Sequence, residues 1–209
     1  MFIIALDYLL EMAPDSPQAS RWKSLREGIE RNVRAHLWDE KRQKFIPHIY
    51  PEKSPIPEGF DELAIHYHGG TAVAIEAGLL SKDEIRTVNA QMLENVRLSG
   101  MPSIGLTLYP VYPDGFFHGG MSKAYLYQNG GDWTWFGGRM IQQLVVNGMV
   151  EEAYAEIHPM IERVIQNDGF YEWYGKGGVP SGSGNFKGSA GVLSKAIELL
   201  RDWAEKNKS

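Results

Sequence analysis

A segment built around two adjacent glycines recurs along this chain at intervals of about 60 residues. It reads HYHGGTAVA at 66–74 and YQNGGDWTW at 127–135, and a weaker third copy, GNFKGSA, lies at 184–190. Each copy opens a stretch of helical periodicity and follows a long segment rich in aromatic residues. An interval of this size is somewhat above the usual range for helical repeats and fits a helical hairpin with a long loop. The repeat therefore predicts a toroid of helix pairs.

Apolar residues recur at spacings of three or four in several segments, a pattern typical of helices that bury one side. The expected helices cover about 2–12, 17–37, 66–78, 81–96, 131–147, 150–164 and 188–206. Ser81 and Glu84 form the pattern of a capping box at the start of the fourth. No composition shift divides the chain. We therefore expect residues 1–209 to form a single all-α domain with four inner and three outer helices.

The links between these helices are strongly asymmetric. Links of two or three residues follow the glycine-started helices, whereas the links before them run to roughly 20–30 residues, far above the short-loop norm. The long links cover 38–65, 99–126 and 167–187. In an alternating array of hairpins they all fall on the same face, and loops of that length are usually functional. The asymmetry predicts one working face that carries long, β-hairpin-like loops.

The composition of the chain limits the kinds of molecule that it can be expected to bind. The net charge of −5 argues against nucleic acid and anionic membranes as partners. No apolar run is long enough to span a bilayer. The first ten residues lack a basic region and a cleavage site, so we expect no signal peptide, and the compartment stays open between cytoplasm and periplasm.

The absence of cysteine excludes disulfides and thiolate metal sites. We expect no cofactor and no metal, because His66 and His68 lack a clear third ligand.

The second glycine copy carries the first candidate site. Asp132 lies in the first turn of its expected helix, where a carboxylate is stabilised by the helix dipole, and Trp133 and Trp135 flank Thr134 directly after it. Adjacent glycines allow a ligand or another backbone to come close. The alternative is that Asp132 only starts a helix and that both tryptophans belong to the core.

A second candidate site is a carboxylate set among aromatic residues. Glu172 stands within the sequence GFYEWY at 169–174. Aromatic faces stack on the C–H surfaces of sugars, and a carboxyl in such surroundings can be tuned as a catalytic acid or base. The alternative is a strand with alternating faces whose Glu172 points to solvent. A third stretch, 58–62, fits a solvated acidic loop better than a site.

Residues 127–200 resemble the C-terminal part of the (α/α)6 toroid, or six-hairpin, glycoside hydrolases. NGGDWTW at 129–135 is similar to the N/R-G-x-x-W-P-W element that opens an inner helix in those families, with Thr134 where proline is usual. GFYEWY at 169–174 is similar to a glutamate-centred aromatic element that follows their next outer helix. The groups that the chain resembles most are the amylo-α-1,6-glucosidase, trehalase and α-glucosidase relatives.

The resemblance implies a glycosidase that cleaves oligosaccharides with a pair of carboxyl groups. Glu172 would be the general base that activates water. A complete toroid has six hairpins, and the general acid of these enzymes lies well upstream, which by analogy falls before Met1. The chain would then be the C-terminal part of a larger catalytic domain, and it can be inactive on its own. Its partner would be the missing half, or a second copy bound through an exposed apolar edge.

On this interpretation Asp132 binds a sugar hydroxyl or else is the acid partner of Glu172. Four aromatic residues would form the walls of the sugar subsite: Trp133, Trp135, Trp173 and Tyr174. Three further polar residues would contact hydroxyls: Gln128, Asn129 and His68. Two alternatives stay open. One is a sugar epimerase or polysaccharide lyase on a similar toroid, with an acid–base pair drawn from His66, His68, His118 and Tyr171. The other is a non-catalytic sugar-binding helical module.

Overall fold

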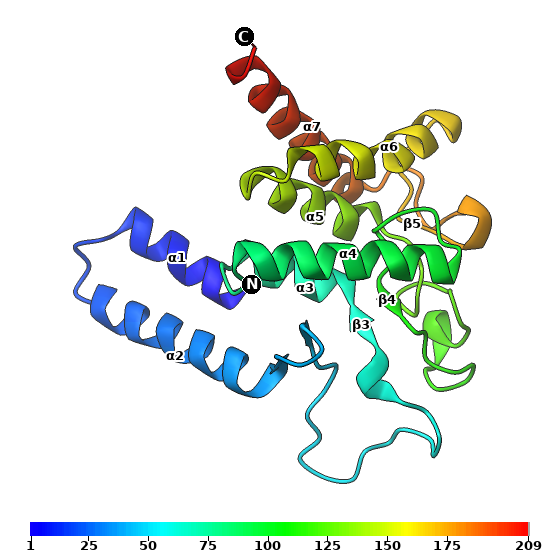
Figure 1. Ribbon diagram of the computed structural model, residues 1–209, viewed down its shortest axis with the longest axis horizontal. Coiled ribbons are helices and arrows are strands. Elements are labelled where there is room, and N and C mark those ends of the chain that lie inside the picture. The colour runs from blue at the N-terminus through cyan, green and yellow to red at the C-terminus, as the bar shows by residue number, and fades with distance from the viewer. Residues whose placement is uncertain (209) are drawn as a thin grey trace.

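The computed structural model of the protein describes residues 1–208 and consists mainly of helices in this range (Figure 1). The seven α-helices of residues 1–208 are α1 (Phe2–Met12), α2 (Ala19–Leu37), α3 (His68–Glu76), α4 (Lys82–Ser99), α5 (Thr134–Val146), α6 (Val150–Gln166) and α7 (Lys187–Lys206). The prediction of an all-α fold with seven helices is therefore confirmed. The boundaries differ by only a few residues; α5, for example, begins at Thr134 instead of Gly131.

The helices pack as successive hairpins. Helix α1 packs against α2, α3 against α4, and α5 against α6. In addition, α5 packs along both α3 and α7. Ile3 and Ile4 of α1 pack beside Val73 of α3. The odd-numbered helices α1, α3, α5 and α7 thus form one row, and α2, α4 and α6 flank it. Figure 1 shows the α1–α2 pair at one end of this row and α7 at the other.

The main core lies between α3, α4, α5, α6 and α7. Periodic apolar residues of each helix meet there, including Val88, Ile141, Ile157 and Leu193, all of which are buried. Each such side chain contributes roughly 1.5–3 kcal/mol when it leaves water. The start of α4 is fixed as expected, because Ser81 Oγ accepts from Glu84 N at 3.3 Å and Ser81 N donates to the Glu84 carboxylate at 2.7 Å.

The long links contain three short antiparallel ladders. Two are local hairpins: β1 (Trp38–Asp39) with β2 (Lys44–Phe45), and β5 (Trp173–Tyr174) with β6 (Pro180–Ser181). The third joins two different links, because β3 (His66–Tyr67) pairs with β4 (Leu108–Tyr109). Short 3-10 turns lie at Glu62–Ala64, Gly119–Met121 and Lys176–Gly178. The links with β3, β4 and β5 lie together on the right and lower right of Figure 1, so the predicted loop face is present.

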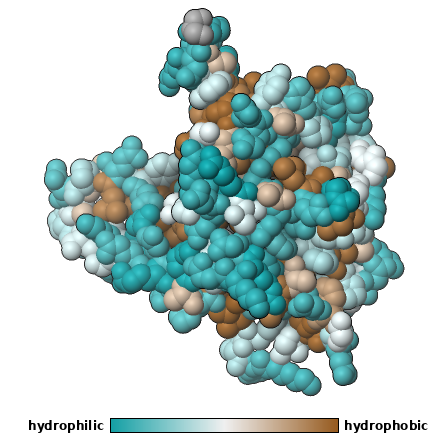
Figure 2. All heavy atoms as spheres, in the orientation of Figure 1, coloured by the Kyte–Doolittle hydropathy of each residue, from teal (hydrophilic) through white to brown (hydrophobic). Residues whose placement is uncertain are grey.

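Hydrophobic residues also reach the surface at the end of the helix row. Figure 2 shows brown residues gathered near the base of the C-terminal helix. Tyr154, Ile197 and Trp203 are exposed and line a groove of about 640 Å³ between α6 and α7. Within residues 1–208, no helix is both long and apolar enough to cross a membrane.

Candidate active site

Backbone hydrogen bonds join the three long links beneath the inner helices. The His68 amide donates to the Thr107 carbonyl at 2.9 Å, and the Thr107 amide donates to the Gly131 carbonyl at 2.9 Å. Asp132 and Tyr174 then exchange two bonds, from the Asp132 amide at 2.9 Å and from the Tyr174 amide at 2.8 Å. The segments that open α3 and α5 and the segment that carries Glu172 are therefore held side by side.

The Asp132 carboxylate is buried beneath the loop face, where it contacts Arg163 and Ser103. Its side chain is 0% exposed, and its Oδ1 lies 2.7 Å from Nη1 of Arg163, which is 5% exposed. The Ser103 hydroxyl lies 2.9 Å from Oδ1 and 2.7 Å from Oδ2. Arg163 in turn donates to Thr134 Oγ1 at 2.6 Å. In this conformation both oxygens of Asp132 contact protein groups, and the side chain has no exposed surface.

Tyr174 lies against the same buried arginine. The Arg163 guanidinium is 4.1 Å from the centre of the Tyr174 ring, and the tyrosine is fully buried. Burial raises the pKa of the Tyr174 hydroxyl, and the cation of Arg163 opposes that rise. The structure thus places Tyr174 behind the loop face rather than on its surface.

Glu172 lies at the surface of the loop that joins α6 to α7. It is partly exposed, and its amide donates to the Ser183 carbonyl at 2.9 Å. Its carboxylate contacts the backbone of Gly182 and Ser183; the Ser183 amide lies 3.5 Å from Oε2. Gly182 has a φ of +72°, and a side chain there would collide with the glutamate. The glycine-rich loop therefore leaves room for this carboxylate and holds it only weakly.

Aromatic rings connect the two candidate segments. The Tyr127 ring lies 4.9 Å from the Trp133 ring and 6.2 Å from the Trp173 ring. Trp133 is buried, and its Nε1 donates to the Tyr127 carbonyl at 3.2 Å. Trp173 and Trp135 are partly exposed, and the Arg139 guanidinium covers Trp135 at 4.5 Å. Trp133 and Trp173 are thus brought together through Tyr127, and Trp173 is next to Glu172 in the chain.

The three polar residues that were expected to contact sugar hydroxyls, Gln128, Asn129 and His68, lie in different surroundings. Gln128 is exposed. Asn129 is buried, where its Oδ1 accepts from the Tyr112 amide at 2.9 Å and its Nδ2 donates to the Tyr112 carbonyl at 3.1 Å. His68 is buried beside Asn95, whose Nδ2 lies 3.0 Å from the ring, and burial lowers the pKa of the imidazole to about 3. Asn129 and His68 therefore serve internal contacts in this conformation.

Sequence reasoning missed a second carboxylate on the loop face. Glu62, expected in a solvated acidic loop, is only 10% exposed in its side chain. Its Oε1 lies 2.6 Å from the hydroxyl of Tyr112, 2.7 Å from Nδ1 of His48 and 2.8 Å from the hydroxyl of Tyr50. The expectation of a solvated loop is wrong for Glu62, because donors from distant parts of the long links converge on it. The only sequence signal was the position of the acidic stretch just before the first glycine copy.

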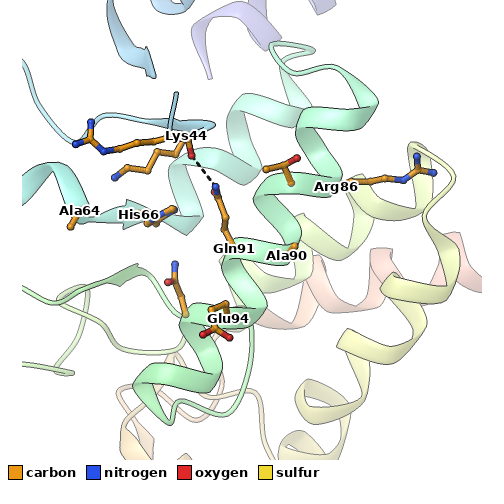
Figure 3. A pocket seen from close by; sticks show the side chains of 10 residues that line it. Lys44, Ala64, His66, Arg86, Ala90, Gln91 and Glu94 are labelled. Carbon is orange, nitrogen blue, oxygen red and sulfur yellow. Dashed lines mark hydrogen bonds between the residues drawn. The ribbon is translucent and has the colours of Figure 1, made fainter. Parts of the chain in front are cut away.

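A broad open groove of about 870 Å³ lies elsewhere, between α4 and the segment that contains β2 and β3 (Figure 3). Gln91 bridges its wall by donating to the Arg42 carbonyl at 2.9 Å, and the Arg86 side chain points away from that wall. Lys44 is buried at its edge, where burial lowers the pKa of the amine to about 8. None of the nine predicted site residues lines this groove. Across residues 1–208, no group of three or more His, Asp or Glu side chains is arranged to hold a metal ion.

Comparison with known proteins identifies the fold. No family model matches the sequence, and no curated protein matches it. Among solved structures, the chain is similar to a GH63 mannosylglycerate hydrolase from Thermus thermophilus, crystallised with Tris and D-glycerate, at a TM-score of 0.62 and 18% identity. The match covers 95% of this chain and 43% of that one. The chain therefore shares the helical-hairpin arrangement of part of that hydrolase, and it spans less than half the length of that solved structure.

Proposed function

We propose that this chain is part of a glycoside hydrolase and that Glu172 is its general base. The observation that carries the proposal is the position of Glu172: a partly exposed carboxylate on the loop face of a toroid fold, followed directly by the partly exposed ring of Trp173. The likeness to a mannosylglycerate hydrolase supports the reaction class by fold alone. The particular sugar and linkage are not implied by it.

The proposed chemistry needs two carboxyl groups. Glu172 would take a proton from water as the water attacks the anomeric carbon, while a carboxylic acid gives its proton to the departing oxygen. Inversion requires the two groups to lie roughly 6.5–9.5 Å apart, so that a water fits between them. We propose that the acid is supplied by hairpins of the toroid that this chain does not contain, since the chain spans 43% of its solved relative.

The burial of Asp132 changes the role that we propose for it. A carboxylate that is paired with Arg163 and has no exposed surface stabilises the fold. The backbone of Asp132 is also hydrogen-bonded to the backbone of Tyr174, which belongs to the same loop as Glu172. We propose Asp132 as a positioning residue. Trp173 and Trp135, which are partly exposed, would form the sugar walls, with Trp133 and Tyr174 packed behind them.

The test is sugar release from a panel of α- and β-linked disaccharides. The assay compares this chain with a preparation that also contains the additional hairpins proposed above, each with Glu172 or with Glu172→Gln. Loss of a general base reduces turnover about 10²–10⁴-fold. Glu152→Gln, at an exposed position of α6, is the matched control and should keep full activity. Unchanged turnover in Glu172→Gln would refute the assignment. Sugar binding without hydrolysis in every preparation would instead favour the epimerase, lyase or binding-module alternatives.

A further inference from the structure

The outer helices α2, α4 and α6, which flank the inner row, repeat one packing pattern. Helix α4 packs against its hairpin partner α3, and it contacts the preceding outer helix α2 through the ion pair of Arg34 and Glu84 at 2.8 Å. Helix α6 packs against α5, and it contacts α4 because Asn89 donates to Glu156 at 2.7 Å. Each of these two helices therefore lies against its own inner helix and against the outer helix before it.

Helix α7 is where this pattern stops. It belongs to the inner row and packs along α5, but it is the one inner helix of residues 1–208 that has no outer partner of its own. One further step of the pattern would place an outer helix against both α6 and α7. The groove of about 640 Å³ lies at that position, because all the residues that line it belong to α6 and α7. Figure 1 shows the end of α7 projecting beyond the other helices.

The walls of this groove are apolar and accessible. Tyr154 of α6 is 60% exposed, and Ile197 and Trp203 of α7 are 44% and 45% exposed. Tyr154 and Glu156 are two residues apart and therefore point about 200° apart around the axis of α6. The groove thus lies on a different side of α6 from the side that contacts α4. Large apolar side chains gathered in one exposed groove are typical of a surface that another protein segment covers.

The chemistry of the groove defines its occupant. A groove between two packed helices accepts the apolar side of a third helix, whose contact residues recur at spacings of three and four. Three polar side chains at the groove are exposed, Glu151, His158 and Arg201, so the positions that flank the apolar side of the occupant should be polar. The chain corresponds to 43% of the solved hydrolase, which therefore contains enough further chain to supply such a helix.

We propose that the groove between α6 and α7 is an interface that receives an amphipathic helix, the outer partner of α7, from the additional hairpins of the toroid. The source of this helix rests on the proposed function, which requires hairpins beyond this chain. The groove itself does not depend on the role of Glu172. Binding there would fix the position of the additional hairpins relative to the inner row.

The chain contains no cysteine, so a single introduced thiol reports on the groove. The test compares maleimide labelling of Ile197→Cys in this chain alone and in the preparation that contains the additional hairpins, with the labelled peptide quantified by mass spectrometry. Labelling at position 197 should be roughly tenfold or more slower in the longer preparation, because a covered thiol reacts only when the helices open. Ala155→Cys, exposed on α6 outside the groove, is the matched control and should react equally fast in both.

A second measurement places a charge in the groove. Ile197→Asp should leave the melting temperature of this chain alone nearly unchanged, because the side chain is exposed there. The same variant should melt well below the wild type in the longer preparation, because the carboxylate would be buried in an apolar contact. Ala155→Asp should have the same small effect in both preparations.

Equal labelling at position 197 in the two preparations would overturn the proposal. Slower labelling of this chain alone at high protein concentration, with a doubled mass in light scattering, would identify a second copy as the occupant and overturn it as well. So would the absence of any further helical hairpin in the protein purified from its native source.

The two proposals can fail separately. Protection at position 197 together with unchanged hydrolysis in Glu172→Gln would refute the proposed function alone. Loss of hydrolysis in Glu172→Gln without protection at position 197 would refute the interface alone.

Discussion

Asp132 and Arg163 form a buried ion pair, with Oδ1 and Nη1 2.7 Å apart and side chains that are 0% and 5% exposed. Asp132 stands before α5 and Arg163 near the end of α6, so the pair ties the second glycine copy to the outer helix behind it. Taking one partner away leaves a charge in a site that water does not reach, which costs far more than a lost surface pair.

Asp132→Asn and Arg163→Met should each lower the free energy of unfolding by about 3–5 kcal/mol. The double variant should lose less than the sum of the two, because the second change removes the charge that the first left unpaired. Urea denaturation measures all three. The exposed pair Arg201 and Asp202 is the control, and its loss should leave the free energy of unfolding nearly unchanged. Additive losses at the buried pair would contradict a direct coupling.

Much of the helical frame could be predicted from the sequence, whereas the burial of site residues could not. Periodicity placed the helices because each buries one side, and the capping box at Ser81 is a local pattern. The enclosure of Asp132 depends on Ser103 and Arg163, each about 30 residues away in the chain. One signal was present: Arg163 follows Met160 by three residues, so a cation falls at a buried position of an amphipathic helix.

The same limit applies to the loop face. The repeat predicted one working face, but not the pairing of β3 with β4, which joins two links about 40 residues apart. Glu62 illustrates the consequence. Local composition indicated a solvated acid, whereas donors from His48, Tyr50 and Tyr112 turn it into an ordered acceptor.

Glu156 of α6 should make the protein less stable as the pH rises. Burial raises the pKa of this carboxyl to about 7, although the hydrogen bond from Asn89 at 2.7 Å opposes the rise. The folded state therefore holds a proton that the unfolded state releases near its ordinary pKa of about 4.3. Stability from this group is full below that pH and is lost as the pH rises towards 7.

Glu156→Gln removes this dependence. The amide cannot ionise, and it can donate to Asn89 Oδ1, a buried oxygen without a partner within residues 1–208. We expect the variant to melt at a higher temperature than the wild type at pH 8 and at about the same temperature at pH 4.5. Glu152→Gln, at an exposed position of the same helix, should show no such divergence. Equal melting curves for Glu156→Gln and wild type at both pH values would show that Glu156 is not a protonated group in the fold.

His68 should make the protein less stable as the pH falls, which is the opposite of the effect of Glu156. Burial lowers the pKa of its imidazole to about 3, so the folded state keeps it neutral while the unfolded state takes up a proton near pH 6.5. The stability that it contributes is full above that pH and is lost as the pH falls towards 3. His68→Gln should flatten the fall in unfolding free energy between about pH 6.5 and pH 4, measured by urea denaturation. His158→Gln, at an exposed position of α6, is the control. An unchanged slope in His68→Gln would mean that this histidine is protonated in the folded protein.

The backbone at position 105 approaches Asp132 and Trp133 so closely that only glycine fits there. A Cβ built there would meet Oδ1 of Asp132 and would lie 2.6 Å from the carbonyl oxygen of Trp133, which is fixed backbone. Gly105→Ala should therefore destabilise the fold by about 1–3 kcal/mol, since the segment that carries Asp132 has to shift. Gly191 in α7 offers the matched control, because its Cβ would meet nothing within 4 Å. Gly191→Ala should stabilise the helix by about 0.5–1 kcal/mol. If Gly105→Ala were as stable as wild type, the close contact between these two segments would not exist in solution, and the support that we propose for the loop of Glu172 would fail with it.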